Sequence, residues 1–365
     1  MALARAARDR GQTDVYDACR RQVSRMRIQG ALTSLARGID DIFYRRYRST
    51  AIREPVFIVA PPRSGTTLLF NLMARDQAFT CMKTYQTQVP AISFEHLIQR
   101  IARLDRPLGG RLSRLLDKFN EQAAQFEHVH RTRLEEPEED SSLFMAALTE
   151  PNINLIFPFG HAMADRWYLD DLPEPERTRV MDYYVGSLKR HLYDAPGRSL
   201  LVKNAHSASR IASLRQAFPD LRVINIARHP YETVPSSVSL VANGYRVMTG
   251  VEPDTKRAEW NAIADATIEY YRRLLRFERS FPTDQWITVR FDELVRDPLN
   301  TVHRIYAQLG LTMSAEAERA IGEEAANSTR HRSRGHSYTL DEFGLTHQKI
   351  YEPLQEVFAH YGFEP

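Results

Sequence analysis

The chain has 365 residues, and its 49 lysine and arginine residues against 46 aspartate and glutamate residues give a net charge of +3. That near balance argues against a protein whose main partner is a nucleic-acid backbone, and the length suits one large α/β domain with an appendage. Only Cys19 and Cys81 occur, outside any metal-ligand spacing, so the sequence predicts neither a disulfide framework nor a zinc cluster.

Residues 1 to about 50 are predicted to form a polar, arginine-rich helical extension. Their apolar side chains recur at roughly helical spacing: Ile28, Leu32, Leu35, Ile39 and Ile42 or Phe43. A helix docked on the rest of the protein is the simplest interpretation, but Arg45, Arg46 and Arg48 leave contact with an anionic membrane surface or a partner open. The N-terminus lacks the apolar core of a signal peptide and no stretch approaches a membrane span, so we expect a cytoplasmic protein without an integral membrane segment.

Residues 55–69, PVFIVAPPRSGTTLL, predict a buried strand, a tight loop and the start of a helix. This arrangement aims backbone N–H groups and the positive end of the helix dipole at one anionic site. Compared with the frame G-x-x-x-x-G-K-[ST], Ala60 replaces the first glycine and Thr66 replaces the lysine. Arg63 supplies a cation inside the loop instead, where it can span a phosphate and a transferred group. The alternative is a plain turn that only connects strand to helix.

The remaining pattern alternates strands with helices within a predicted domain of residues 51–365. Residues 77–198 are expected to be a mostly helical, irregular insertion, placed where a cap that binds the acceptor substrate would be. Apolar runs then predict three more buried parallel strands, at 199–205, 221–230 and 285–294, separated by helical patterns at 206–217, 231–242 and 258–281. The fold class is therefore α/β, a three-layer parallel sheet flanked by helices, with its catalytic loops at the carboxyl ends of the strands.

Arg228 follows the strand at 221–227, and Ser236 stands about two turns into the next helix. These two side chains can converge on a second phosphate, separate from the anion held by the first loop. Taken alone this signal is weak, because an arginine at a strand end is often only a solvated residue at the rim of the sheet.

Together these motifs resemble the sulfotransferases that use 3′-phosphoadenosine 5′-phosphosulfate (PAPS), most closely a bacterial type. The resemblance runs from about Val56 to the C-terminus and includes, in order, LEEPEED, LLVKNAH, FPDLRVINIARHP, FDELVRDPLNTVHRIYAQLGL and YTLDEFGL. It implies a fold related to P-loop nucleotide kinases. It also implies that the first loop holds the 5′-phosphosulfate through Arg63, Ser64, Gly65, Thr66, Thr67 and Leu68, and that Arg228 and Ser236 hold the 3′-phosphate.

The resemblance suggests further site residues. Lys203 matches a lysine of the family and could reach the sulfonate, although a strand-end lysine that extends to solvent explains it equally well. The basic stretch RHRSRGHSYTL at 330–340 resembles a segment that folds over the adenosine bisphosphate. Its candidate contacts are Arg332, Arg334, His336 and Tyr338, and the alternative is an ordinary solvated loop.

Sulfonate transfer also needs a base for the acceptor hydroxyl, and no metal is demanded. Related enzymes place a glutamate shortly after the first helix, but KTYQTQVP at 83–90 carries no acid. The segment at 128–140, HVHRTRLEEPEED, is rich in groups that can titrate, and there we favour His130 or Glu138. The alternative is a solvated loop in which Pro137 begins a helix with an acidic first turn.

The predicted reaction is metal-independent transfer of a sulfonate from PAPS to a hydroxyl of a small-molecule, lipid or glycan acceptor. Two alternatives stay open at this point: a magnesium-dependent ATP kinase on a related fold, and a nucleotide-binding protein without transferase activity. The sequence does not indicate the acceptor or the oligomeric state.

Overall fold

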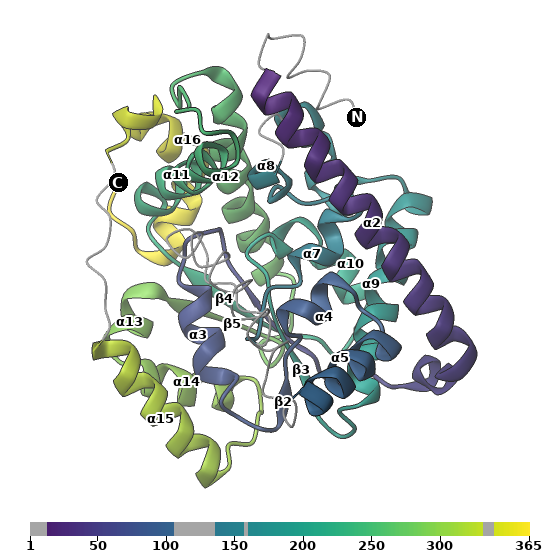
Figure 1. Ribbon diagram of the computed structural model, residues 1–365. Helices are drawn as coiled ribbons and strands as arrows, with labels where there is room; N and C mark the ends of the chain where they lie inside the picture. The colour runs from purple at the N-terminus through teal and green to yellow at the C-terminus, as the bar shows by residue number, and fades with distance from the viewer. Residues whose placement is uncertain (1–12, 106–135, 157–159, 331–338) are drawn as a thin grey trace.

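The computed structural model describes residues 13–105, 136–156, 160–330 and 339–365. A parallel five-stranded sheet forms the centre of the molecule and carries helices on both faces (Figure 1). The strand order is β2-β3-β1-β4-β5. The strands are β1 (Val56–Val59), β2 (Phe79–Thr80), β3 (Ser199–Lys203), β4 (Arg222–Ala227) and β5 (Trp286–Arg290).

Each central strand buries both of its faces, which explains why these segments read as continuous apolar runs. Phe57 faces one helical layer, formed mainly by α9 (Glu174–Tyr193), α10 (Ile211–Ala217) and α12 (Ala258–Glu278). The next residue, Ile58, faces the opposite layer of α3 (Thr66–Met73), α14 (Pro298–Gln308) and α15 (Ala315–Arg330). A third apolar cluster joins α12 to α11 (Pro230–Thr249) and α16 (His347–Tyr361).

The doubly wound parallel sheet predicted from the sequence is confirmed, with corrections at its ends. The predicted strand 285–294 is too long, because the chain turns into helix α13 (Phe291–Arg296) after Arg290. Asp292 and Glu293 in its first turn favour that helix through the helix dipole, and Leu294 anchors it in the core. Strand β2 was missed because two residues are too short to produce a recognisable pattern.

Residues 77–198 contain β2 and several short helical segments before α9. The segments are α4 (Thr84–Gln88), α5 (Ile92–Asp105), α7 (Ser141–Met145), α8 (Ile153–Ile156), and the 3-10 helices η2 (Gly160–Trp167) and η3 (Leu169–Asp171). Helix α9 packs directly on the sheet, so at least this part of the insertion belongs to the main core. The acceptor-binding role of the insertion stays a prediction.

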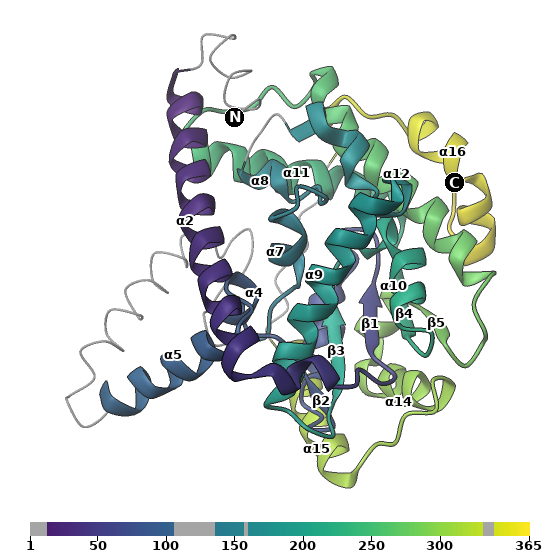
Figure 2. The same cartoon turned by 90° about the vertical axis from the view of Figure 1, so that its right-hand side faces the viewer.

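The predicted N-terminal helix is present as α2 (Thr13–Phe43), followed by η1 (Arg45–Ser49), and it runs along the outside of the molecule (Figure 2). It docks through Cys19, Ala36 and Asp40, which are buried. The carboxylate of Asp40 accepts the N–H groups of Ile92 and Ser93, 2.9 and 2.8 Å away, and so caps the start of α5. The apolar residues expected to form the docking face lie instead on the outer face of α2.

Two 3-10 segments complete the described elements, η4 (Ser207–Ser209) after β3 and η5 (Asp341–Phe343) before α16. No helix within the described ranges combines the length and the apolar character needed to cross a bilayer.

Candidate functional site

The loop between β1 and α3 forms a cradle for an anion. Arg63 and Gly65 adopt left-handed backbone conformations, with φ of +68° and +89°. A Cβ on Gly65 would lie 2.5 Å from the ring of Phe291, so only glycine fits at this position. Within the described ranges, the backbone N–H groups of residues 63–67 donate to no acceptor, and the buried hydroxyl of Ser64 has no hydrogen-bond partner. These unsatisfied donors at a helix N-terminus suit a phosphate or sulfonate group.

Two strand connections meet at this loop because β1 lies between β3 and β4 in the sheet. Arg63 Nε donates to Ser236 Oγ at 3.1 Å, and Arg228 Nη1 donates to the carbonyl oxygen of Arg63 at 2.8 Å. Arg228 is further held by Glu232 at 2.6 Å and by the ring of Phe291, 4.1 Å from the guanidinium carbon. The structure therefore brings Arg63, Arg228 and Ser236 together at the point where strand connections diverge, which is the usual ligand position in such sheets.

A buried lysine and a carboxylate reach the same loop from the other side. Lys203 ends β3, is 3% exposed, and pairs in register with Ile58 of β1. Its Nζ donates to Thr67 Oγ1 at 3.2 Å and lies 2.9 Å from Glu139 Oε1. Lys203 is therefore no solvated strand-end residue, because it links the first turn of α3 to an acidic group.

Glu139, and not Glu138, is the glutamate in contact with Lys203. The backbone here is extended, since Glu138 N–H donates to Met82 at 2.9 Å and Pro137 bridges Lys83. Successive side chains on extended backbone point to opposite sides, so Glu139 points to Lys203. The Glu138 carboxylate instead accepts the N–H of Glu139 at 2.8 Å. The alternative in which Pro137 begins a helix with an acidic first turn is wrong. Helix α7 begins only at Ser141, and its first turn contains no acidic residue.

Of the remaining predicted site residues, some are packed in the protein around the loop and others lie outside the described residues. Thr66 is buried at the start of α3, and Leu68 packs against the core beneath the loop. The predicted base His130 and the predicted adenosine contacts lie outside the described residues; these contacts are Arg332, Arg334, His336 and Tyr338.

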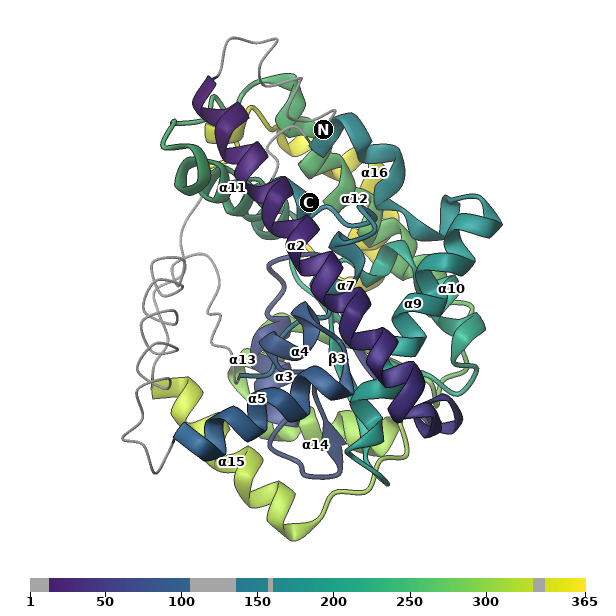
Figure 3. The same cartoon turned by 45° about the vertical axis from the view of Figure 1, so that its right-hand side comes forward.

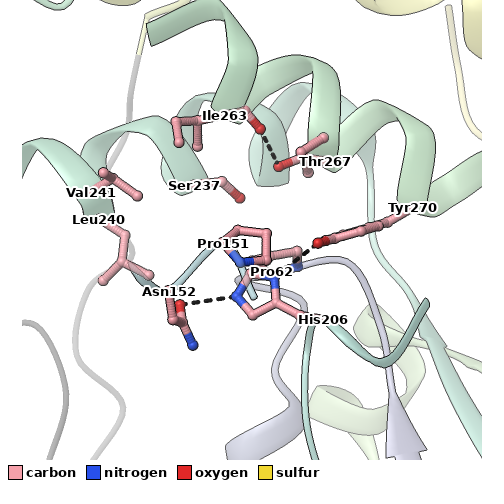
Figure 4. A pocket seen from close by; sticks show the side chains of 11 residues that line it. Pro62, Pro151, Asn152, His206, Ser237, Leu240, Val241, Ile263, Thr267 and Tyr270 are labelled. Atoms are coloured by element: carbon pink, nitrogen blue, oxygen red, sulfur yellow. Dashed lines mark hydrogen bonds between the residues drawn. The ribbon is translucent and has the colours of Figure 1, made fainter. Parts of the chain in front are cut away.

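A small apolar pocket lies beside the loop between β1 and α3 (Figure 4). Pro62 of the loop forms one wall, and α11 and α12 form another through residues such as Leu240, Val241 and Ile263. The polar lining residues are Asn152, His206, Ser237, Thr267 and Tyr270. Of these, His206 follows β3 and was missed from the sequence although it stands in the stretch LLVKNAH. Its position just beyond the carboxyl end of a strand was the available signal.

Two neighbours hold the neutral ring of His206 in one tautomer (Figure 4). Its Nε2 lies 2.9 Å from Asn152 Oδ1, and its Nδ1 lies 3.3 Å from the Tyr270 hydroxyl. Because the amide nitrogen of Asn152 donates to Glu150, its oxygen faces the histidine. Nε2 therefore carries the proton, and Nδ1 accepts from Tyr270. Burial lowers the pKa of His206 to about 3, so the ring is neutral at neutral pH.

A buried polar network lies behind the lysine and the glutamate. Asn204, next to Lys203, donates to Asp140, next to Glu139, at 2.6 Å. Asp140 also accepts from the Tyr184 hydroxyl at 2.5 Å, and burial raises its pKa to about 6. This side-chain bond ties the end of β3 to the segment before α7 and so fixes the distance between Lys203 and Glu139.

Glu150 connects this network to the pocket wall. It pairs with Arg210 at 2.8 Å, both side chains being fully buried, and it accepts from Asn204 at 3.3 Å and from Asn152 at 3.1 Å. Within the described ranges, no group of three or more histidine, cysteine, aspartate or glutamate residues is arranged to hold a metal ion.

Comparisons with known proteins agree on one family. The sequence model of the sulfotransferase family matches residues 55–315. The chain is 23% identical over 326 residues to the omega-hydroxy-beta-dihydromenaquinone-9 sulfotransferase Stf3 of Mycobacterium bovis, a match that covers 88% of this chain and 79% of that protein.

Two solved structures share the fold. The sulfotransferase STF9 of Mycobacterium avium superposes with a TM-score of 0.72 and 21% identity, covering 98% of this chain and 86% of its own. The sulfotransferase STF1 of Mycobacterium tuberculosis superposes with a TM-score of 0.65 and 22% identity, covering 89% of this chain and 81% of its own. These neighbours share the layered α/β architecture described above.

Proposed function

This chain belongs to the sulfotransferase family, and from that premise we propose that it transfers a sulfonate group from PAPS to a hydroxyl of an apolar, lipid-like acceptor. The observation that carries the proposal is the position of Lys203, which joins Thr67 in the first turn of α3 to Glu139. Pro62 of the loop between β1 and α3 lines the apolar pocket. The family membership also removes the support for the kinase and for the binding protein without transferase activity.

The donor suits the loop and the arginine cluster. The N–H groups of residues 63–67 and the orphaned Ser64 hydroxyl fit the 5′-phosphosulfate, which offers only acceptors. Arg228 and Ser236 fit a 3′-phosphate, which would replace the contacts that Arg63 and Glu232 now make with them. No residue of this set needs a metal ion in order to bind an anion.

The acceptor suits the pocket. Six of its eleven lining residues have proline, aliphatic or alanine side chains. The five polar ones already hydrogen-bond within the protein: His206 with Asn152 and Tyr270, Ser237 with the carbonyl of Thr233, and Thr267 with the carbonyl of Ile263. The relative Stf3 bears the name of an enzyme that acts on a hydroxylated menaquinone, which is an apolar acceptor of the same kind. A hydroxyl on an apolar chain therefore fits the pocket better than a glycan does.

In the proposed reaction the acceptor oxygen attacks sulfur as the bond from sulfur to the 5′-phosphate oxygen breaks. The carboxylate of Glu139 takes the hydroxyl proton, and Lys203 stabilises the charge that develops on the sulfonate and departing phosphate oxygens. Arg63 adds a second cation from within the loop. Asp140 and Asn204 hold the base and the lysine at their present separation.

The donor site is tested by calorimetric binding of adenosine 3′,5′-bisphosphate and of ADP without Mg²⁺. We expect the wild type to prefer the bisphosphate, and Arg228→Ala to lose that preference. Arg279→Ala is the matched control, because Arg279 also pairs with a glutamate but lies at the end of α12. Equal binding of ADP by the wild type would overturn the two-phosphate site.

The base is tested by transfer of labelled sulfonate to a hydroxylated polyprenyl quinone. Glu139→Gln should lower kcat by about 10²–10⁴-fold and leave bisphosphate binding intact. Glu138→Gln is the neighbouring control and should stay within a few-fold of the wild type. If Glu138→Gln loses activity and Glu139→Gln keeps it, the original sequence prediction is right and the present assignment of the base is wrong.

A further inference from the structure

The outer face of α2 carries an apolar stripe that no described part of the chain covers. The α2 stripe consists of Ile28, Leu32, Leu35, Ile39, Ile42 and Phe43, all exposed, with Ile28 at 70% and Phe43 at 75%. Spacings of four and three residues keep these side chains on one side of the helix over about 20 Å. Isolated apolar residues on a surface are ordinary, but a continuous row of this size indicates a binding surface.

The fold does not need the stripe, because α2 docks through its other side. Cys19 packs with Ile153 of α8, and Ala36 packs with Val89 and Ala91. Farther along, the buried Asp40 pairs with Arg190 at 3.1 Å. The helix is therefore fixed to the body, along whose outside it runs (Figure 3), and its exposed apolar stripe is directed outward.

Arginines lie at both ends of the stripe. Before it stand Arg20, Arg21, Arg25 and Arg27, and after it stand Arg45, Arg46 and Arg48, all exposed. Arg21 and Arg25 continue the four-and-three spacing, so they lie on the same side as the stripe. The nearby Asp41 is already engaged, at 2.9 Å from Arg190 and 3.3 Å from Arg48.

We propose that the α2 stripe binds the surface of an anionic lipid bilayer. In this arrangement α2 lies in the plane of the membrane, the six apolar side chains enter the boundary with the acyl chains, and the arginines contact lipid phosphates. Burial of the apolar side chains of the α2 stripe drives insertion into the bilayer, and the arginines at its two ends attract the anionic headgroups.

The charges disfavour a second copy of this chain as the occupant. A parallel pair of α2 helices would place Arg21 and Arg25 against the same residues of the other copy. An antiparallel pair would turn them toward Arg45, Arg46 and Arg48. Like charges meet in both cases, whereas an anionic surface neutralises both ends at once.

Membrane binding through α2 also places the pocket near the lipid. Ile153, on which α2 packs, directly follows Pro151 and Asn152 of the pocket wall. An acceptor with a lipid tail would therefore meet the enzyme at the surface where that tail resides. This link rests on the proposed function, but the binding of α2 to a bilayer does not.

The test is co-sedimentation of the full chain with vesicles of phosphatidylcholine alone or mixed with phosphatidylglycerol. We expect binding to the anionic vesicles that weakens as salt is raised. Ile28→Ser combined with Leu35→Ser and Ile42→Ser should abolish binding. Because one arginine near an anionic surface contributes about fivefold, Arg21→Glu with Arg25→Glu should weaken binding by about 30-fold or more.

The controls separate this proposal from other occupants and from the proposed function. Arg279→Glu with Arg296→Glu changes the same charge on exposed residues elsewhere and should leave binding unchanged. Bisphosphate binding by every variant shows that the fold is intact and does not depend on catalysis. Absence of vesicle binding by the wild type would overturn the proposal. So would a dimer, measured by light scattering, that the triple serine variant converts to a monomer.

Discussion

Replacing Glu150 by glutamine tests whether the buried ion pair supports the site. Glu150 and Arg210 are both fully buried, and their charged groups lie 2.8 Å apart. Burial opposes the charge on Arg210, but the carboxylates of Glu150 and Asp140 overcome that effect and raise its pKa. Glutamine keeps the volume of Glu150 but leaves Arg210 charged and without its direct counterion in the interior.

The expected loss is about 3–5 kcal/mol in the free energy of unfolding, the range measured when one partner of a buried pair is removed. One feature of the structure favours the upper part of that range. Within the described ranges, Arg210 Nε and Nη1 have no hydrogen-bond partner, so the pair with Glu150 is the main compensation for the buried charge. The carboxylate of Asp140 and the ring of Phe144, 3.6 Å from the guanidinium carbon, still favour the charge and so keep the loss within the range.

Urea denaturation of the wild type and of Glu150→Gln measures this loss. The double variant Glu150→Leu with Arg210→Met should regain most of the stability, because it removes both charges and fills the space with apolar side chains. Its pocket would still lack the carboxylate that orients Asn152 and His206, so transfer activity should stay low. A loss below about 1 kcal/mol for Glu150→Gln would refute this account of the pair.

Two further predictions concern the phosphate loop and acid stability. Gly65→Ala combines an unfavourable positive φ with a clash against Phe291, so it should lower stability by about 1–3 kcal/mol and weaken bisphosphate binding. Gly197→Ala is the control. Its φ is +80° and the space around it is open, so it should affect only stability. Burial lowers the pKa of His191 to about 4, whereas a pKa of about 6.5 is expected in the unfolded chain. Below about pH 6.5 the unfolded chain therefore binds a proton that the folded state does not, and the folded state loses stability as the pH falls. Between about pH 7 and pH 5 the wild type should lose about 2 kcal/mol more than His191→Gln in urea titrations, and parallel curves would contradict this.

The geometry of the loop between β1 and α3 could be predicted because its parts are consecutive in the chain. An apolar strand, a glycine that tolerates positive φ and a helix N-terminus create the cradle within about ten residues, with little help from distant contacts. The same reasoning applies to Arg228 and Lys203, since polar residues at the ends of parallel strands gather at one edge of the sheet. In both cases local pattern and simple topology were sufficient.

The choice between neighbouring residues could not be predicted. Glu138 and Glu139 have the same chemistry, and only the extended backbone held by Met82 decides which of them meets Lys203. His206 likewise gains its place in the pocket from Asn152 and Tyr270, which lie far from it in the sequence. The direction of a side chain depends on such long-range contacts, which cannot be predicted from composition or spacing.

The apolar spacing of α2 shows the same division between sequence and tertiary structure. Helical periodicity identified the stripe correctly, because side chains three and four residues apart always share a helix face. It could not decide which face docks, since docking depends on the surface that the rest of the chain offers. Asp40 and Cys19 found partners in the body, and the more apolar face was left outward. The sequence alone therefore determined the sheet, the loop and the helix. Tertiary structure decided which glutamate meets Lys203, where the pocket lies and which surface is exposed, because each of these depends on residues from separate parts of the chain.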